Sequence, residues 1–336
     1  MKNSFKYLTI FLLGLAVLAG CKKEDEDDTV TKLSLTGNLT TSIPTYVLPG
    51  DKYVVTFEGM SRNDGGEVGY IFRDPFTEKL DTVKYDTESK VPEPVTVVMG
   101  SQLGSYTAVV TAFASGYYDR SVYAEFTIID NDLQTGCLQA HNIKPTDKSI
   151  ITADGEEYYY TRIGDLDWFR QNVRDFSMGY SYSDSKALDK VMGRYYNWKQ
   201  AQVVCPDGWR LPSEEDFASL AKALGCSDAA PFQDFKGLAG DLMANATFLG
   251  KRMWTYWRNV DITDKSSFCA IPTGYVVEGS SHKFKDFNVR SFFWTSDEKD
   301  GSGVYRSIYH DCGDVLVGTA DEEYFSIPVR CVRNAQ

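Results

Sequence analysis

The stretch CPDGWRLPSEEDFASLAKAL, residues 205–224, contains the signals that decide how the second half of the chain begins to fold. Ser213 is well placed as a helix N-cap, and Asp216 stands at the capping-box position. Glu214 and Glu215 fall in the first turn, where the helix dipole favours carboxylates. The three acids are therefore predicted to start a helix rather than to form a catalytic cluster. The apolar face of this helix is predicted to contain Phe217, Leu220, Ala221 and Leu224.

The amino terminus has the pattern of an export signal. Lys2 and Lys6 supply positive charge, residues 8–19 form an apolar run, and small residues precede Cys21. The ending LAGC resembles the lipobox of bacterial lipoproteins, which implies a lipid on Cys21 and loss of residues 1–20. The apolar run is short for a membrane span, which needs about 20 residues. An ordinary secretory signal or a membrane anchor is the alternative.

Residues 21–32 are predicted to form a tether. The segment KKEDEDDTVT, which follows Cys21, is charged and contains too few apolar residues to pack. It resembles the acidic surface-export signal of Bacteroidetes lipoproteins. This resemblance implies a lipid-anchored protein on the outer leaflet of the outer membrane, in contact with the membrane only through its lipid. A plain solvated linker is the alternative.

The composition limits the number of domains and the class of partner. The 336 residues exceed the usual size of a single domain, which favours two domains. The formal net charge is −12, whereas nucleic acids and anionic membranes attract clustered Lys and Arg. We therefore expect neutral ligands and no nucleic-acid partner.

The cysteine content indicates disulfides. Apart from Cys21, the chain has six cysteines, an even number that favours disulfides in an exported protein. They form no C-x-x-C pair and no Cys/His cluster with zinc spacing, so metal-thiolate chemistry is not expected. The residues alone leave the pairing open among Cys137, Cys205, Cys226, Cys269, Cys312 and Cys331.

Residues 33–132 have the texture of a β-domain. Short β-branched and aromatic segments, such as YVVTFEG, YTAVVTAFA and VYAEFTIID, alternate with Gly-containing turns, which predicts an antiparallel sandwich. Tyr106 stands where a tyrosine corner would open a late strand of an immunoglobulin-like domain. The segment resembles the Ig-like modules of Bacteroidetes surface lipoproteins, which implies a spacer. A binding role for Tyr117 and Tyr118 is the alternative.

The second half carries a set of motifs that follow the polar boundary at residues 131–137. These are EEYYYTRIGDLDWFRQNVR, GRYYNWKQAQVVCPDGWRLPSEEDFASL, SSFCAIPTGY, SFFWTSDE and FSIPVRCVR. In combination they resemble the Fibrobacter succinogenes major paralogous domain over about residues 140–334, within a predicted domain of residues 137–336. The resemblance implies an α+β, C-type lectin-like fold with two helices beside a small sheet and a long loop.

The same resemblance implies roles for several motif residues. It pairs Cys205, in the turn before the helix, with Cys331 in the last strand, a cross-link that adds roughly 4 kcal/mol on the chain-entropy model. Cys269 replaces the threonine usual in the family, and Phe293 replaces a tryptophan. The cysteine implies an extra disulfide. Aromatic residues inside motifs are mostly core residues, and the tryptophans concerned are Trp168, Trp198, Trp209 and Trp294.

The candidate ligand site is the segment MWTYWRNVDITDKSSF, residues 253–268, at the place of the long loop in a lectin-like fold. Sugar recognition needs an aromatic face against the apolar side of a ring, together with planar polar groups for paired hydrogen bonds to hydroxyls. The alternative is that Trp254 and Trp257 anchor the loop in the core. The candidate ligand-binding residues of the loop are Trp254, Tyr256, Trp257, Arg258, Asn259 and Asp261.

A second candidate wall lies in VYRSIYHDCGDV, residues 304–315. If this segment is a strand, Tyr305, Ser307 and Tyr309 share one face, because successive side chains of a strand alternate. Tyr305 and Tyr309 are then expected to line a sheet surface beside the loop. Ordinary cross-strand aromatic packing is the alternative.

Motifs for catalysis and for metal binding are weak. The three histidines lack a partner pattern, and G-x-S-x-G, H-E-x-x-H and G-x-G-x-x-G are absent. Two distant carboxylates of a glycosidase would leave no such motif, but we assign no catalytic residue and expect no enzyme. We also expect no cofactor. Asp297, Glu298 and Asp300 offer oxygen ligands for calcium without an EF-hand spacing, and a solvated hairpin is the default there.

These observations predict a non-catalytic lipoprotein of the cell surface that captures a polysaccharide or oligosaccharide for an outer-membrane importer. By analogy with Bacteroidetes systems, its partners would be a TonB-dependent transporter and the transporter's lid lipoprotein. A β-fructan such as levan is one neutral candidate among several. The alternative class is a fimbrial or adhesive structural protein whose lectin-like head binds a protein partner.

Overall fold

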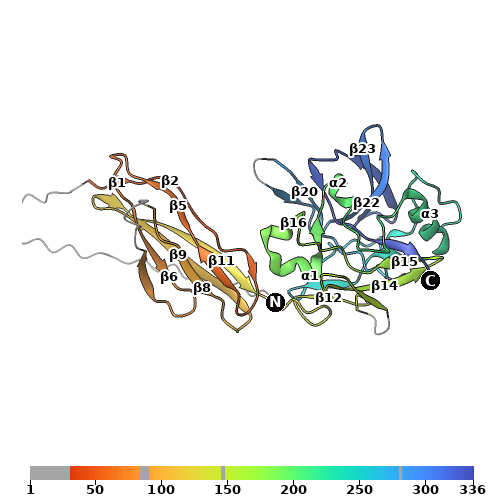
Figure 1. Ribbon diagram of the computed structural model, residues 1–336, viewed down its shortest axis with the longest axis horizontal. Helices are drawn as coiled ribbons and strands as arrows, with labels where there is room; N and C mark the ends of the chain where they lie inside the picture. Colours follow the sequence, from red (N-terminus) through yellow and green to blue (C-terminus); the bar gives the residue numbers. More distant parts are fainter. Residues whose placement is uncertain (1–30, 84–90, 145–147, 280–281) are drawn as a thin grey trace, which may run out of the picture.

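Two lobes follow one another along the long axis of the computed structural model, the first from the N-terminal part of the chain and the second from the C-terminal part (Figure 1). The expected export signal, lipidated Cys21 and most of the tether lie outside the described residues. Within the part of the chain that is described, no helix combines the length and hydropathy of a membrane span. The structure describes residues 31–83, 91–144, 148–279 and 282–336.

The regular elements described in the N-terminal lobe are all strands, as the alternating segments predicted. The largest sheet has the order β3-β11-β9-β6-β7, and three strand pairs complete the lobe around one hydrophobic cluster. The sheet comprises β3 (Tyr46–Val47), β6 (Gly69–Arg73), β7 (Leu80–Val83), β9 (Gly104–Phe113) and β11 (Arg120–Ile128). The pairs are β1 (Leu33–Ser34) with β10 (Tyr117–Tyr118), β2 (Thr36–Thr41) with β5 (Phe57–Ser61), and β4 (Lys52–Val55) with β8 (Val95–Val98).

The tyrosines singled out in this lobe have different surroundings. The Tyr106 hydroxyl donates to the Gln102 carbonyl oxygen at 2.9 Å, the hydrogen bond expected of a tyrosine corner. Tyr117 is buried, so its ring contributes to the core, whereas the neighbouring Tyr118 is exposed. Only Tyr118 of this pair therefore presents a ring to a ligand.

A mixed polar and apolar contact joins the two lobes. The Tyr46 amide donates to Ser185 Oγ at 3.0 Å, and the Tyr46 ring packs edge-on against Phe248 at 5.6 Å between centroids. Asn131 Nδ2 donates to the Ala187 carbonyl oxygen at 3.2 Å. Leu48 packs against the cluster of buried residues that contains Phe248 and Ala187. These contacts hold the second lobe at one end of the first.

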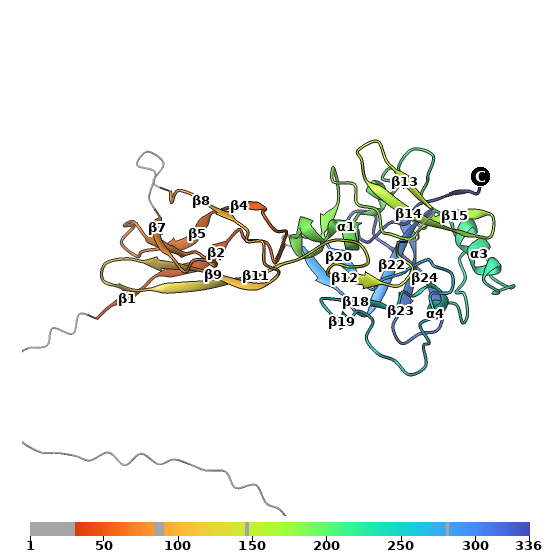
Figure 2. The same ribbon diagram turned by 90° about the horizontal axis from the view of Figure 1, so that it is seen from below.

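The C-terminal lobe is built from small sheets that surround a larger hairpin-based sheet, seen from below in Figure 2. The sheet that positions the candidate site comprises β22 (Arg290–Lys299), β23 (Ser302–Tyr309) and β24 (Val315–Ala320), all antiparallel. A four-stranded sheet comprises β13 (Ser149–Ile151), β14 (Glu157–Ile163), β15 (Leu166–Phe169) and β26 (Val332–Asn334). Another sheet comprises β12 (Leu138–Ala140), β18 (Ala246–Phe248) and β19 (Lys251–Arg252). A further sheet comprises β20 (Tyr275–Val277), β21 (Lys283–Lys285) and β25 (Phe325–Ser326). The strands β16 (Tyr180–Ser181) and β17 (Arg194–Tyr195) form a pair.

The predicted helix is present as α3 (Glu214–Ala223). Ser213 Oγ accepts from the Asp216 amide, and the Asp216 carboxylate accepts from the Ser213 amide, so the capping box is complete. The resemblance implied two helices, and α3 is the one of more than one turn among the described residues. The helices α1 (Asp189–Met192), α2 (Trp198–Ala201) and α4 (Ala239–Leu242) span one turn each. After α2, two valines and a proline in the sequence VVCP disfavour a longer helix.

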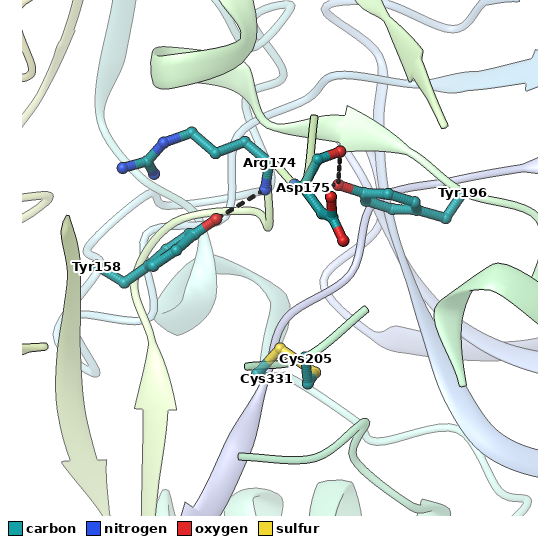
Figure 3. The surroundings of a disulfide bond; sticks show 6 residues. All are labelled: Tyr158, Arg174, Asp175, Tyr196, Cys205 and Cys331. Atoms are coloured by element: carbon teal, nitrogen blue, oxygen red, sulfur yellow. Dashed lines mark hydrogen bonds between the residues drawn. A yellow bond between two sulfur atoms is a disulfide. The ribbon is translucent and has the colours of Figure 1, made fainter. Parts of the chain in front are cut away.

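The disulfide that the resemblance implied is confirmed. Cys205 and Cys331 are bonded across a sequence separation of 126 residues (Figure 3). Nearby, the Tyr158 hydroxyl accepts from the Arg174 amide at 3.0 Å, and the Tyr196 hydroxyl accepts from the Asp175 amide at 2.7 Å. The cross-link therefore fixes the last strand beside the turn that precedes α3.

The expectation of an extra disulfide at Cys269 is wrong. Cys269 is a free, fully buried thiol, and its Sγ lies 3.4 Å from Asp264 Oδ2. Burial raises the pKa of this thiol well above its usual value, and the Asp264 charge raises it further. The thiol thus occupies the place of a small core side chain. The other free cysteines are Cys137, Cys226 and Cys312.

The tryptophans of the shared motifs lie in or against the core, as predicted. Trp168 and Trp294 are fully buried, and Trp209 is buried against Phe169 with 4.3 Å between ring centroids. Trp198 is half-buried, and its Nε1 donates to the Thr295 carbonyl oxygen at 2.9 Å.

Candidate functional site

The segment at residues 253–268 forms a long irregular loop between β19 and β20, as predicted. Two contacts fix its path. The Thr255 amide donates to the Asn288 carbonyl oxygen at 2.9 Å, and the Thr263 amide donates to the Gly240 carbonyl oxygen at 3.0 Å. The first contact brings the loop to the start of β22, so the loop runs beside the three-stranded sheet.

Trp254 does not contribute a ligand-facing ring. Its side chain is 1 % exposed and belongs to the same core cluster as Trp168 and Phe217. This burial corrects the expectation that Trp254 forms part of an aromatic platform, and it favours the alternative that this residue anchors the loop. The physical reason is that Trp254 follows Met253, another buried residue, before the loop turns outward.

The rest of the predicted loop residues are exposed. Trp257 is 43 % exposed and its ring contacts His310 edge-on, with 6.1 Å between centroids. Tyr256 is 70 % exposed, and the Arg252 guanidinium lies 5.7 Å from its ring centroid. The loop therefore presents two aromatic rings to solvent. The exposed polar residues that follow them are Arg258, Asn259 and Asp261.

The second predicted wall shows the expected alternation in part, because Ser307, between the two tyrosines, is buried as well. Arg306 and Ile308 of β23 point into the core and are fully buried, whereas Tyr305 and Tyr309 are half-buried on the opposite face. His310, next to Tyr309, is the residue that contacts Trp257. The loop and the strand therefore meet at the end of β23. The sequence predicted that Tyr305 and Tyr309 lie beside the loop, whereas the ring that Trp257 contacts is that of His310.

Tyr305 lies in an aromatic cluster over β24. Its ring stacks on Phe325 with 5.7 Å between centroids and meets Phe292 edge-on at 5.3 Å. It also lies over Gly318, where an added Cβ would be 2.5 Å from the tyrosine ring. The ring of Tyr305 is thus held in one position, and the alternative of cross-strand packing describes it well.

Arg290, at the start of β22, was not predicted from the sequence and is central to this face. It pairs with Tyr309 across the sheet, and its guanidinium carbon lies 3.1 Å from the Tyr309 ring centroid. Its side chain is 17 % exposed. Burial lowers the pKa of Arg290, while the neighbouring Asp286 and the tyrosines Tyr305 and Tyr275 act in the opposite direction. A cation is therefore held, partly desolvated, against aromatic rings.

Several buried polar atoms at this end of the sheet, Ser291 Oγ among them, have no hydrogen-bond partner in the described part of the chain, and three of these atoms lie around Arg290. They are Asn288 Oδ1, Arg290 Nε and His310 Nδ1. Buried polar atoms are usually paired, and exceptions concentrate where function rather than stability determines the residue. Below, we refer to Tyr275, Arg290, Tyr305 and Tyr309 together as the Arg290 face.

A separate hollow of about 570 Å³ lies beside the disulfide. Its walls include Tyr158, Asp175, Cys205 and Trp209. Two of its polar residues have protein partners: the Tyr158 hydroxyl accepts from the Arg174 amide, and Asp175 Oδ1 accepts from both the amide and the hydroxyl of Ser177. This hollow offers fewer unpaired polar groups than the Arg290 face.

The acidic residues considered for calcium have structural contacts. Asp297 Oδ2 accepts from the Glu214 amide at 2.7 Å, at the start of α3, and Asp300 lies in the turn of the β22–β23 hairpin. Across the described parts of the chain, no group of three or more His, Cys, Asp or Glu side chains is arranged to hold a metal ion. Asp297 thus supports the start of α3.

A protein-family model described as the Fibrobacter succinogenes major domain matches residues 161–333, just over half of the chain. The match covers α3, the disulfide and the whole Arg290 face. Comparisons with curated proteins and with solved structures gave no match.

Proposed function

The chain belongs to the Fibrobacter succinogenes major domain family, and from that premise we propose that it is a non-catalytic glycan-binding protein of the cell surface. The observation that carries the proposal is the Arg290 face. Half-exposed tyrosines flank a guanidinium that donates to no acceptor among the described residues, and the exposed Trp257 contacts His310, the residue that follows Tyr309. Aromatic faces with planar hydrogen-bonding groups are what a sugar ring requires.

The proposed architecture places this face away from the membrane. A lipid on Cys21 and the acidic tether would anchor the protein in the outer membrane, facing the exterior. The all-strand lobe would act as an Ig-like spacer, and the second lobe as a C-type lectin-like head. In support, the Tyr106 hydrogen bond is of the tyrosine-corner type, and the loop at residues 253–268 is long and irregular. In such a position the head would hold polysaccharide for an outer-membrane TonB-dependent transporter and its lid lipoprotein.

The ion pairs of two acidic residues near the sheet support a binding role rather than catalysis. Glu214 and Asp216 are each engaged by an arginine, Arg306 and Arg210 respectively. Arg210 helps to lower the pKa of Asp216, which makes this carboxylate a poor general acid. The Arg290 face presents aromatic and guanidinium groups instead.

Replacing Trp257 or Tyr309 with alanine is expected to weaken glycan binding by at least about tenfold, because each change removes an aromatic surface from the sugar. Affinity electrophoresis against a panel of neutral polysaccharides, followed by calorimetry on those that retain the protein, measures the effect. Phe232→Ala is the matched control, since Phe232 is 44 % exposed, close to the 43 % of Trp257, and lies before α4.

Binding to none of the polysaccharides would contradict the proposal. Binding that both aromatic substitutions leave unchanged would show that glycan is held elsewhere, and the hollow beside the disulfide would then be the next surface to test. Unchanged thermal unfolding of each variant ensures that a loss of binding is local.

A further inference from the structure

We propose that Arg290 and Asp286 form a clamp for two neighbouring hydroxyls of one sugar ring, so that the head selects glycans whose units carry free vicinal diols. The inference rests on the proposed glycan-binding function and names the chemical class that the Arg290 face takes. It assigns the donors to the Arg290 guanidinium and the acceptor to the Asp286 carboxylate.

The Arg290 guanidinium keeps N–H donors that no acceptor among the described residues uses. No acceptor among the described residues takes a hydrogen bond from it, and of its three nitrogens only Nε is both sealed from solvent and unpaired. The two Nη groups are therefore the accessible part. A guanidinium presents its N–H groups in one plane as a fixed fork, which suits two adjacent acceptor oxygens.

The orientation of this fork is fixed by packing. The guanidinium carbon lies 3.1 Å from the Tyr309 ring centroid and 5.0 Å from that of Phe292. The backbone of Arg290 is fixed as well, because the Arg290 carbonyl oxygen accepts from the Gly274 amide at 2.8 Å. A donor pair held in place before binding loses little conformational entropy when the ligand arrives.

Asp286 lies beside Arg290 without neutralising it fully. Asp286 Oδ2 is 3.8 Å from Arg290 Nε, which is within ion-pair range but too long for a hydrogen bond. The carboxylate is 35 % exposed, and none of the hydrogen bonds described for the protein uses its side-chain oxygens. Both groups of the pair therefore keep free hydrogen-bonding capacity on the solvent side.

The turn that carries Asp286 is held in place by its backbone. The Asp286 carbonyl oxygen accepts from the Val289 amide at 3.1 Å and the Arg290 amide at 3.0 Å. Gly274 packs so closely that a Cβ there would lie 1.9 Å from the Lys285 carbonyl oxygen. Asp286 is thus positioned by the fold rather than by its contact with Arg290.

Charge favours a neutral diol over an acidic sugar. Asp286 and Asp311 both act electrostatically on Arg290, and an incoming carboxylate would meet these two negative charges. A sugar hydroxyl both donates and accepts, so one hydroxyl can accept from an Arg290 Nη group and donate to Asp286. The neighbouring hydroxyl can accept from the second Nη group. Tyr275 and Tyr305 lie near enough to Arg290 to act on its charge.

The experiment compares glycans that differ in vicinal diols. Levan and dextran carry them along the chain, whereas a linear β-1,3-glucan does not, and periodate oxidation followed by borohydride reduction destroys them in a polymer that otherwise binds. The wild-type protein is expected to bind at least one diol-bearing polymer and to lose at least about tenfold in affinity after oxidation of that polymer. Polygalacturonate serves as the acidic probe.

Arg290→Gln and Asp286→Asn are expected to lose at least about tenfold in affinity for the intact polymer, and to bind intact and oxidised polymer equally well. Arg290→Lys is expected to recover little, because an ammonium lacks the planar fork. Arg73→Gln, which removes a half-exposed guanidinium from the N-terminal lobe, is the control for a loss of surface charge.

The outcomes separate the two proposals. If the wild-type protein binds no polysaccharide, the glycan-binding function itself is contradicted. If it binds but tolerates periodate oxidation, or if Arg290→Gln binds as tightly as the wild type, the clamp is overturned while glycan binding stands. Preferred binding of polygalacturonate that collapses at high salt would instead identify a carboxylate as the ligand of Arg290 and would also overturn the clamp.

Discussion

Replacing Glu214 with glutamine is expected to lower the free energy of unfolding of the C-terminal lobe by about 3 to 5 kcal/mol, the cost of breaking a buried ion pair from one side. Glu214 and Arg306 are 1 % and 0 % exposed, and two contacts join their side chains. Glutamine keeps the shape of the side chain but removes its charge. The Arg306 cation would then stay buried without compensation.

The surrounding contacts make the loss difficult to relieve. Arg306 Nη1 donates to the Gln233 carbonyl oxygen at 2.6 Å, and the guanidinium lies 3.8 Å from the Phe235 ring centroid. Burial lowers the pKa of Arg306, and Glu214 opposes that shift. Glu214 Oε2 also accepts from the Phe232 amide at 2.7 Å. The pair therefore ties the start of α3 to the middle of β23 and to the segment that follows α3.

Urea denaturation followed by tryptophan fluorescence measures this effect, because all six tryptophans lie in the C-terminal lobe. The double change Glu214→Leu with Arg306→Met is expected to recover most of the lost stability, since it buries no charge. Glu323→Gln, which breaks the exposed pair between Lys199 and Glu323, is the control and should leave the transition unchanged. A Glu214→Gln protein as stable as the wild type would show that Arg306 is compensated elsewhere.

The helix at residues 214–223 shows which part of a site is readable from sequence. The N-cap Ser213 and the capping residue Asp216 were predictable because both act within one turn of chain. The partner of Glu214 was not predictable, because Arg306 lies 92 residues away and is brought near by strand pairing. The sequence correctly predicted that the three acids start a helix, but nothing in it indicated that Glu214 forms a buried ion pair.

The candidate site was predictable in outline only. Composition identified the loop at residues 253–268, and alternation identified Tyr305 and Tyr309 as one face. An irregular loop has no periodicity, so the local sequence could not distinguish the buried Trp254 from the exposed Trp257. Arg290 was missed because a charged residue at the start of a strand is ordinarily expected to point into solvent. Its pairing with Tyr309 depends on the register of the β22–β23 hairpin.

Cysteine pairing depended on family resemblance in the same way. The pair Cys205 and Cys331 followed from motifs that the family shares, and it is present. Cys269 lies outside that shared pattern, and counting cysteines suggested a partner for it. The structure instead surrounds its thiol with Asp264 and the Ser267 carbonyl oxygen in a sealed core. An even cysteine count therefore overestimates the number of disulfides in this lobe.

Removing the Cys205–Cys331 disulfide with the double change Cys205→Ser and Cys331→Ser is expected to destabilise the C-terminal lobe by about 4 to 5 kcal/mol on the chain-entropy model. The reason is the length of the closed loop, whose ends are 126 residues apart in sequence. The loop contains α3, the whole Arg290 face and the long loop at residues 253–268. Thermal and urea unfolding under oxidising conditions measure the difference.

Reductant provides the internal control for this prediction. It should lower the unfolding midpoint of the wild-type protein to that of the double variant, and it should leave the double variant unchanged, because Cys137, Cys226, Cys269 and Cys312 are free thiols. An effect of reductant on the double variant would reveal a second disulfide. Equal stability of the two oxidised proteins would mean that packing already holds Cys331 in place: the Phe169 amide donates to the Cys331 carbonyl oxygen at 3.0 Å, and β26 pairs with β15. The cross-link would then act chiefly by slowing unfolding, and the unfolding rates of the two proteins would still differ.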